Sequence, residues 1–510
     1  MKTDRDWERE LSEVPLGFGG FSPQTMKRVK ERIAKMERKG RRRAFAVAVP
    51  VLVSLAALGI VFQDALPEWL TPHREPEPIL TEATEERITL KVDFYDTISF
   101  VTRFGGPFIV RFPQANFETV RSDADPDPAN TPEAYARWAR ENQVDLLRIP
   151  MSFIDDLTRE GLLVHLDPLI ERDRFELGDL YEPLVRAIRE AGAGELYGLA
   201  PEFSSYALYY NKSMFERNQV PLPYDGMTWD DVLLAAARFP GRTLDGKPVY
   251  GLSFGGGFRG TLIRGALDAG INQGLRIAIP SSRTPTLDTP AWNAWWEAVV
   301  AGVGQGWINA EEPAMPDGGS TRELARVDAF LSGRSAMLYS DHWMLHYIRE
   351  SVRSNLFNDE WGAVAPRAKA SAGGADLGVS VSYVFAIHAE SPHRELAWEW
   401  LKYVHSRDFA LRARQQPFGE IPSYTYTVNP EEDPQAVFYR IDADPAAVVL
   451  RSELQHEGWY WSLYFHVISE LEQHLPDVLS GDLSVADMLA GLQQSAEALL
   501  AARFGETDAP

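Results

Sequence analysis

Strand-like and helix-like patterns of apolar and polar positions alternate along the chain from residue 87 onward. Apolar side chains occupy every second position in Ile88–Tyr95, which is the period of a strand with one buried face. Residues 132–142 carry apolar groups at helical spacing, and Val144–Pro150 predicts a buried strand. Residues 153–172 predict a helix, a turn and a second helix. Apolar strands that alternate with helices indicate an α/β fold with a mostly parallel sheet.

Three more segments extend this prediction. Residues 100–112 have a helical pattern that we expect to break at Gly105–Pro107, because proline has no backbone N–H to donate. Residues 116–122 predict a second strand. From Ala207 the chain predicts a strand that ends at Asn211–Lys212, and two helices joined by a Pro- and Gly-containing loop are expected to follow.

The stretch 44–62 contains no charged residue and is long enough to cross most of a bilayer core. Residues 1–43 before it are basic, and residues 63–87 after it are acidic and rich in proline. The positive-inside rule therefore predicts a single-pass membrane protein with residues 1–43 in the cytoplasm and the large remainder outside the cell. We expect residues 63–87 to be an extended linker. The alternative for 44–62 is a cleaved signal peptide.

Composition narrows the function classes. The formal net charge is −22, and an acidic body argues against binding nucleic acid, because phosphate contacts need a basic surface. The chain has no cysteine, which excludes disulfides, thiolate metal sites, a cysteine nucleophile and a lipid-modified N-terminal cysteine. The basic tail, residues 1–43, could contact anionic lipid or a cytoplasmic regulator.

Four segments, 197–229, 330–348, 361–406 and 467–500, carry motifs in an order that is typical of one family. The first contains Tyr197-Gly198, Pro201, Tyr209-Tyr210-Asn211-Lys212, Val220-Pro221 and Thr228-Trp229. The next contains Phe330, Gly333 and Ala336-Met337 followed by Trp343, and the third contains Trp361-Gly362 and Pro366 followed by a glycine-rich loop. The chain resembles the family 1 extracellular solute-binding proteins of ABC importers over roughly residues 88–505.

This resemblance implies a two-lobed, periplasmic-binding-protein-like fold of type II. The N-lobe would comprise residues 88–203 and 384–432, and the C-lobe residues 204–383 and 433–505. The chain would cross between the lobes along Ala200–Tyr210 and again just before Tyr383, and these crossings would act as a hinge.

The resemblance also implies reversible capture of a small solute, a carbohydrate, and delivery to ABC permease subunits. Two departures from the family keep a second hypothesis open. The chain uses an apolar helix in place of a lipid-bearing cysteine, and it has a cytoplasmic extension. It could therefore be a solute sensor that signals through its tail. A carbohydrate-active enzyme is a further alternative.

A sugar pocket needs aromatic faces and a few well-placed polar groups. Some candidates lie at the carboxyl ends of predicted parallel strands, where such sheets bind ligands. Others lie on the crossings or beside loops. The candidates are Tyr95, Asp96, Ser152, Phe203, Ser204, Tyr206, Phe254, Asp341, Trp343, Tyr383, Trp459 and Tyr460.

No catalytic, cofactor or metal site is predicted. The paired carboxylates are adjacent in sequence, so on one helix they point apart and cannot face each other across a glycosidic bond. His342 and His346 have a spacing that can chelate zinc, but Trp343 occupies the position where a metalloprotease has glutamate.

Overall fold

The computed structural model describes ten stretches of the chain: residues 87–121, 131–239, 243–244, 246–255, 261–311, 320–367, 378–416, 418–425, 429 and 433–504. All of them belong to one compact unit that spans Thr84–Pro510. Among these stretches, no helix combines the length and the apolar character that a membrane crossing requires. The predicted tail (1–43), the membrane helix (44–62) and all but the last residue of the linker (63–87) lie outside the described residues.

The first of two main sheets has five strands in the order β2-β1-β3-β14-β4. β1 is parallel to β2 and β3, whereas β14 is antiparallel to β3 and β4. The sequence therefore predicted the three parallel strands of this sheet. The next strand in this order, β14, comes from more than 200 residues later in the chain. The strands are β1 (Ile88–Asp93), β2 (Ala115–Val120), β3 (Leu146–Ile149), β4 (Gly198–Leu199) and β14 (Val384–Ile387).

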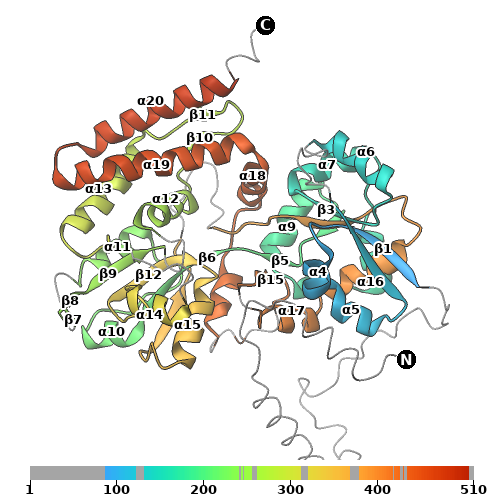
Figure 1. The fold of residues 1–510 in the computed structure, drawn as a ribbon, viewed down its shortest axis with the longest axis horizontal. Helices are drawn as coiled ribbons and strands as arrows, with labels where there is room; N and C mark the ends of the chain where they lie inside the picture. Colours follow the sequence, from blue (N-terminus) through green and yellow to red (C-terminus); the bar gives the residue numbers. More distant parts are fainter. Residues whose placement is uncertain are drawn as a thin grey trace, which may run out of the picture. The chain divides into compact units, whose positions relative to one another are not determined.

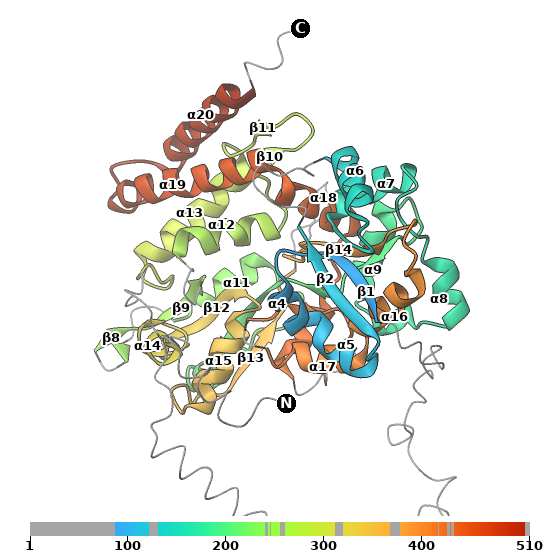
Figure 2. The same ribbon diagram turned by 45° about the vertical axis from the view of Figure 1, so that its right-hand side comes forward.

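Helices surround this sheet (Figures 1 and 2). An aromatic cluster that includes Phe100, Phe104, Phe385 and Trp400 fills the space between them and the strands. The helices are α4 (Thr97–Phe100), α5 (Gly106–Arg111), α6 (Pro132–Asn142), α7 (Ile154–Arg159), α8 (Asp167–Asp173), α9 (Glu182–Ala191), α16 (Arg394–Val404) and α17 (Arg407–Ala413), with the short turns η3 (Met151–Phe153) and η4 (Leu177–Asp179).

The predicted break at Gly105–Pro107 is wrong. The backbone passes from α4 through a π-helical turn, η2 (Val101–Gly105), directly into α5. The N–H of Gly106 bonds to the carbonyl of Val101, five residues earlier. This wider turn shifts the hydrogen-bonding register by one residue. The helix therefore continues past Pro107, which has no N–H to donate.

The second main sheet has four strands in the order β13-β6-β12-β9. β6 is antiparallel to both of its neighbours, and β12 is parallel to β9. The strands are β6 (Tyr206–Asn211), β9 (Tyr250–Phe254), β12 (Ser335–Asp341) and β13 (Trp361–Val364). Two small hairpins, β7–β8 (Thr243–Leu244 and Lys247–Pro248) and β10–β11 (Ala278–Ile279 and Thr284–Pro285), lie outside this sheet.

Most helices of this second half begin at a residue whose side chain caps the helix. Thr228 and Asp231 make a reciprocal capping box that starts α11. Asn211 caps α10 directly after β6, at the point where the sequence predicted the change from strand to helix. The helices are α10 (Lys212–Arg217), α11 (Trp229–Ala236), α12 (Leu262–Asn272), α13 (Pro290–Gly304), α14 (Thr321–Val327) and α15 (Met344–Arg353).

The C-terminal segment consists of the turn η5 (Pro434–Arg440) and three helices, α18 (Pro445–His456), α19 (Gly458–Ser480) and α20 (Val485–Phe504). The helices α19 and α20 pack on each other and against α12 and α13 (Figure 1). In contrast, α18 contacts α9 and η3 beside the first sheet as well as α19. It therefore touches elements from both halves of the fold.

Two of the segments that cross between the halves pair with each other. The first was expected to be one continuous strand over Ala200–Tyr210. It is instead two strands, β5 (Glu202–Phe203) and β6, with Ser204 and Ser205 between them. β5 pairs with β15 (Ile421–Pro422). At the interruption, Ser204 exchanges two backbone hydrogen bonds of 2.9 and 3.0 Å with Ser380 of the second crossing. Ser204 and Ser380 therefore join these two crossing segments.

Candidate functional site

Two adjoining cavities lie next to the crossing segments. The first has a volume of about 700 Å³, and the second about 630 Å³. Pro280, Leu450 and Leu454 line both cavities, so one face of α18 runs along the two. The first cavity is also lined by Ser204 and Ser380 of the crossings and by residues of α12 and α19. Its walls thus come from segments that are far apart in the sequence.

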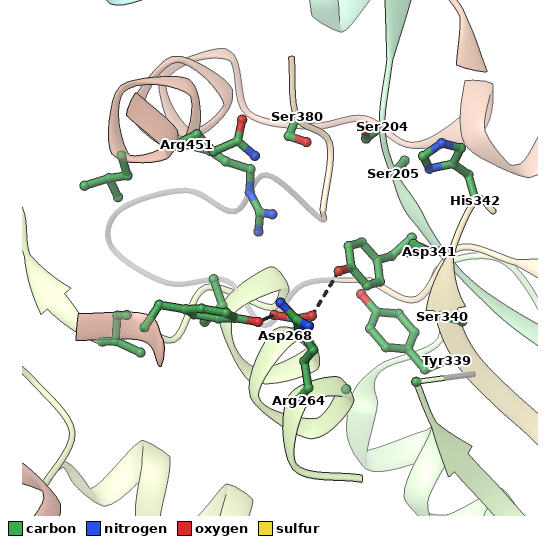
Figure 3. Close-up of a pocket in the computed structure, with 18 of the residues that line it drawn as sticks. Ser204, Ser205, Arg264, Asp268, Tyr339, Ser340, Asp341, His342, Ser380 and Arg451 are labelled. Carbon is green, nitrogen blue, oxygen red and sulfur yellow. Dashed lines mark hydrogen bonds between the residues drawn. The ribbon is translucent and has the colours of Figure 1, made fainter. Parts of the chain in front are cut away.

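A polar cluster centred on Asp268 occupies one wall of the first cavity (Figure 3). The hydroxyl of Tyr206 donates to one carboxylate oxygen at 3.0 Å, and the hydroxyl of Tyr464 donates to the other at 2.6 Å. Burial raises the pKa of Asp268, and these hydrogen bonds oppose the shift. Arg264 lies one helical turn before Asp268 on α12, and its guanidinium lies over the rings of Tyr464 and Phe465.

A buried charged network adjoins the same cavity at the crossings. Glu202 of β5 pairs with Arg103 at 2.6 Å, and His342 contacts Glu420 at 3.1 Å. Ser204 also donates to the Glu420 carboxylate. Burial lowers the pKa of His342, but the hydrogen bond and charge of Glu420 more than compensate, so the net shift is upward. Glu420 shifts downward, because the contact with His342 outweighs the effect of burial.

Aromatic side chains stand at the edge of the first cavity. Trp343 lines it, is 37% exposed, and makes an edge contact with His342 at 5.7 Å. Phe418 and Trp461 also line it and remain partly exposed. Exposed ring faces beside hydroxyl and carboxylate groups can bind both the C–H face and the hydroxyls of a polar organic molecule.

Charged and aromatic side chains line the second cavity. Arg148 lines it, with the guanidinium 5.3 Å from the centre of the Tyr383 ring. Tyr135, at another wall, donates its hydroxyl to the buried Asp93 at 2.7 Å. Burial raises the pKa of Glu453, which lines this cavity from α18.

The chain that forms these cavities matches one known protein family. The model for bacterial extracellular solute-binding proteins matches residues 139–410, which is more than half of the chain. The chain is a member of this family. No match was found among curated proteins.

Solved structures show that this solute-binding protein has the fold expected from the sequence. A sugar transporter from Rhizobium etli in an open conformation is 17% identical, with a TM-score of 0.50, and the match covers 81% of this chain and 99% of that chain. The sugar-binding protein MalE from Xanthomonas citri is 14% identical, with a TM-score of 0.53 and coverages of 83% and 100%. The two-lobed α/β fold is therefore confirmed.

Family membership also settles two broader questions. The expectation of a binding protein and not an enzyme is confirmed, because the family consists of solute-binding proteins. The alternative of a carbohydrate-active enzyme is set aside for the same reason. The family further implies a location outside the cytoplasm, either extracellular or periplasmic.

The structure brings eight of the twelve candidate residues to the cavities of this solute-binding protein. Those that line the first cavity are Ser204, Tyr206, Asp341, Trp343 and Tyr460. Those that line the second are Ser152, Tyr383 and Trp459.

The other four candidates line neither cavity. Phe203 stacks on Tyr181 in the core, and Phe254 packs against Trp229 and Trp295. The Asp96 carboxylate accepts a hydrogen bond from the N–H of Ser99 and so caps α4. Tyr95 is exposed, with its ring stacked on Phe94.

Several lining residues were not predicted from the sequence, notably Arg264, Asp268, Arg451 and Tyr464. The spacing of four residues between Arg264 and Asp268 on a predicted helix could have placed both on one face. No pattern in the sequence could have joined them to Arg451 and Tyr464, which come from two helices nearly 200 residues later.

One group of described residues has the composition of a metal site. His165, Asp167 and Glu195 place one ligand atom each within 4.8 Å of one another. However, Arg189 contacts both carboxylate oxygens of Asp167, at 2.6 and 3.2 Å, and the N–H of Leu196 contacts one of them at 3.0 Å. These donors already use the carboxylate, and a cation beside it disfavours a metal ion. His342 and His346 do not share a site, because His342 contacts Glu420 and the His346 ring packs against Phe418.

Proposed function

We propose that this solute-binding protein captures a carbohydrate between its two lobes and presents it to the permease subunits of an ABC importer. The observation that carries the proposal is the first cavity, where exposed Trp343 and the Asp268 cluster lie beside the Ser204–Ser380 pair. A ligand held there contacts the point at which the halves are joined. It can therefore bias an open–closed equilibrium by as much as its affinity differs between the two states.

The lobe boundaries remain part of this proposal. We assign residues 88–203 and 384–432 to one lobe, and residues 204–383 and 433–505 to the other. The two main sheets fall on opposite sides of this division. The contacts of α18 with α9 and η3 place one helix of the second lobe against the first, beside both cavities. Relative movement of the lobes would change the shape of both cavities.

Ligand capture predicts a thermal shift. A carbohydrate that binds the folded state at 100 times its Kd should stabilise the protein by about 2.7 kcal/mol and raise the Tm. Trp343→Ala should abolish most of this shift, because it removes the exposed ring at the cavity edge. Differential scanning fluorimetry with a panel of mono- and oligosaccharides measures the effect.

The control for this experiment is Tyr224→Ala, which removes an exposed aromatic ring that lines neither cavity. This variant should keep the full ligand-induced shift. The carbohydrate assignment fails if no saccharide in a broad panel raises the Tm of the unsubstituted protein.

We also propose that residues 44–62 anchor the protein, with residues 1–43 in the cytoplasm. The support is the uncharged apolar stretch and its basic flank. The full chain should remain in the membrane fraction after alkaline washing, and added protease should digest the C-terminal part from outside. Leu55→Arg should weaken insertion, because an arginine near the centre of a spanning helix costs about 3 kcal/mol.

Two other results would change this picture. Release of a shortened chain from the membrane would identify 44–62 as a cleaved signal peptide. Deletion of residues 3–40 that abolishes a transcriptional response to the solute, while uptake continues, would favour the sensor hypothesis over delivery.

A further inference from the structure

The first cavity has an unusual charge balance for a protein with a net charge of −22. Among the described residues, three arginines line it, Arg264, Arg276 and Arg451, against two carboxylates, Asp268 and Asp341. Guanidinium groups can donate hydrogen bonds to neutral hydroxyls, but an excess of them also gives the cavity a positive potential that favours an anionic group. The arrangement of these charges therefore bears on the kind of solute that fits.

The carboxylates are engaged by neutral donors. Asp268 accepts hydrogen bonds from Tyr206 and Tyr464, one on each oxygen, and Asp341 accepts one from the backbone N–H of Trp343 at 3.1 Å. Within the described part of the chain, neither carboxylate has an arginine, lysine or histidine nitrogen within 4.0 Å. Neither Asp268 nor Asp341 thus forms a direct ion pair with a described residue.

Arg264 is held in place by rings. Its guanidinium carbon lies 6.0 Å from the centre of the Tyr464 ring and 5.8 Å from that of Phe465, and no carboxylate of the described residues forms an ion pair with it. Aromatic faces position this guanidinium without an ion pair, and the Tyr464 oxygen accepts one hydrogen bond from it, so the remaining N–H groups can serve a ligand. Arg264 is partly buried, which strengthens its attraction for an anion that enters.

Arg451 faces the same space from α18. Figure 3 shows Arg451 reaching down from this helix and Arg264 reaching up from α12, with Asp268 beside them. A hydrogen bond from Arg451 to the side-chain oxygen of Asn272 fixes the direction of its guanidinium. Both cations are close enough to affect Asp268, since the charges of Arg451 and Arg264 each oppose the upward shift of its pKa. Two guanidinium groups thus share one carboxylate that is already hydrogen-bonded.

We propose that the solute carries an anionic group, a carboxylate or a phosphoryl group, which binds between Arg264 and Arg451. The substrate class is then acidic carbohydrates, with the sugar ring against the aromatic edge at Trp343 and the anion at the arginines. Planar guanidinium groups match both kinds of anion with paired hydrogen bonds. This inference rests on the proposed capture of a carbohydrate in the first cavity.

The test compares matched ligands on the full chain by isothermal titration calorimetry. Glucose and galactose are the neutral probes, glucuronate and galacturonate carry the carboxylate, and glucose 6-phosphate carries the phosphoryl group. At least one acidic sugar should bind more tightly than its neutral counterpart. Arg264→Gln should weaken that binding by about 10- to 100-fold, which is the loss expected for a charge-assisted hydrogen bond. Arg322→Gln, at an exposed position on α14 that lines neither cavity, should leave it unchanged.

The outcomes separate the two proposals. Preference for the uronates or for the phosphate supports the inference and identifies the source of the anion. Neutral sugars that bind as tightly as the acidic ones, or acidic-sugar affinity that is the same in Arg264→Gln and the unsubstituted protein, overturns the inference and leaves carbohydrate capture standing. If no sugar in the extended panel binds, the proposed function fails and the inference fails with it.

Discussion

Replacing Gly265 with alanine is expected to destabilise the protein by about 3 kcal/mol, at the upper end of what overpacking costs. Gly265 lies in α12, where an alanine normally stabilises a helix. Here a Cβ would lie 2.3 Å from the backbone nitrogen of Gly255 and 2.8 Å from the carbonyl carbon of Phe254. Gly255 is held by a 3.0 Å hydrogen bond from its N–H to the carbonyl of Tyr339, so this backbone cannot easily move away.

The strain should also reach the first cavity. α12 carries Arg264 and Asp268, so displacement of the helix from the end of β9 moves both groups. Chemical denaturation gives the free energy of unfolding, and calorimetry gives the affinity for a bound solute. Both are expected to decrease.

Gly491 provides the matched control. It lies in the interior of α20, and a Cβ there would meet no atom within 4 Å. Gly491→Ala should therefore stabilise the protein by up to about 1 kcal/mol through helix propensity alone. The opposite signs of the two substitutions distinguish a packing effect from a propensity effect. A Gly265→Ala protein as stable as the unsubstituted one would contradict the close packing of α12 on β9.

The second large effect is a decrease in stability as the pH rises from about 5 to 8.5. Burial raises the pKa of Glu202 to about 7 from its usual 4.5, and the charge of Glu420 adds to the shift, while Arg103 opposes it. Arg103 remains a cation over this whole range. A raised pKa in the folded state means that Glu202 contributes stability below pH 4.5 and loses it as the pH passes through 7. The loss is about 3 kcal/mol.

His342 changes stability in the same direction. Its pKa is also raised on folding, so its contribution is complete below about pH 6.5 and declines at higher pH. The contribution of Glu420 has the opposite sign, because its folded pKa is lowered, and it is lost only as the pH falls below the usual range of a glutamate. The interval from pH 5 to 8.5 therefore reports mainly on Glu202 and His342.

Glu202→Gln tests this assignment. The substitution keeps a hydrogen-bonding side chain but cannot ionise, so the free energy of unfolding in urea should lose most of its decline between pH 5 and 8.5. Glu118→Gln, at an exposed position of β2, should retain the full decline. Parallel pH profiles for Glu202→Gln and the unsubstituted protein would show that another group is responsible.

Local patterns in the sequence predicted many elements of this fold closely. The helix expected over residues 132–142 is α6 (Pro132–Asn142), and the alternation of Ile88–Tyr95 became β1. The strand expected from Ala207 to Asn211 is part of β6, and the helix expected after it begins at Lys212. These features depend on residues that are near one another in the chain, so periodicity and capping chemistry suffice to find them.

The candidate site was predicted less completely. Trp343 was a candidate because it follows a motif of the family, and Tyr206 because it lies on the predicted crossing; both line the first cavity. Phe203 and Phe254 lie in the core. An aromatic residue in a strand looks the same in the sequence whether its ring faces a cavity or a buried layer. Which of the two it does depends on how the strand packs against helices from other parts of the chain.

The sequence alone determined the α/β class, the acidic charge, the absence of cysteine, and membership in a family of solute-binding proteins, because each is a property of composition or of ordered motifs. Only the tertiary structure decided that Arg264, Asp268, Arg451 and Tyr464 share one cavity and that Glu202 is buried beside the crossing. The physical reason is that α12, α18 and α19 meet only when the long-range contacts of the fold have formed, and the charge and burial of a side chain's surroundings arise from those contacts.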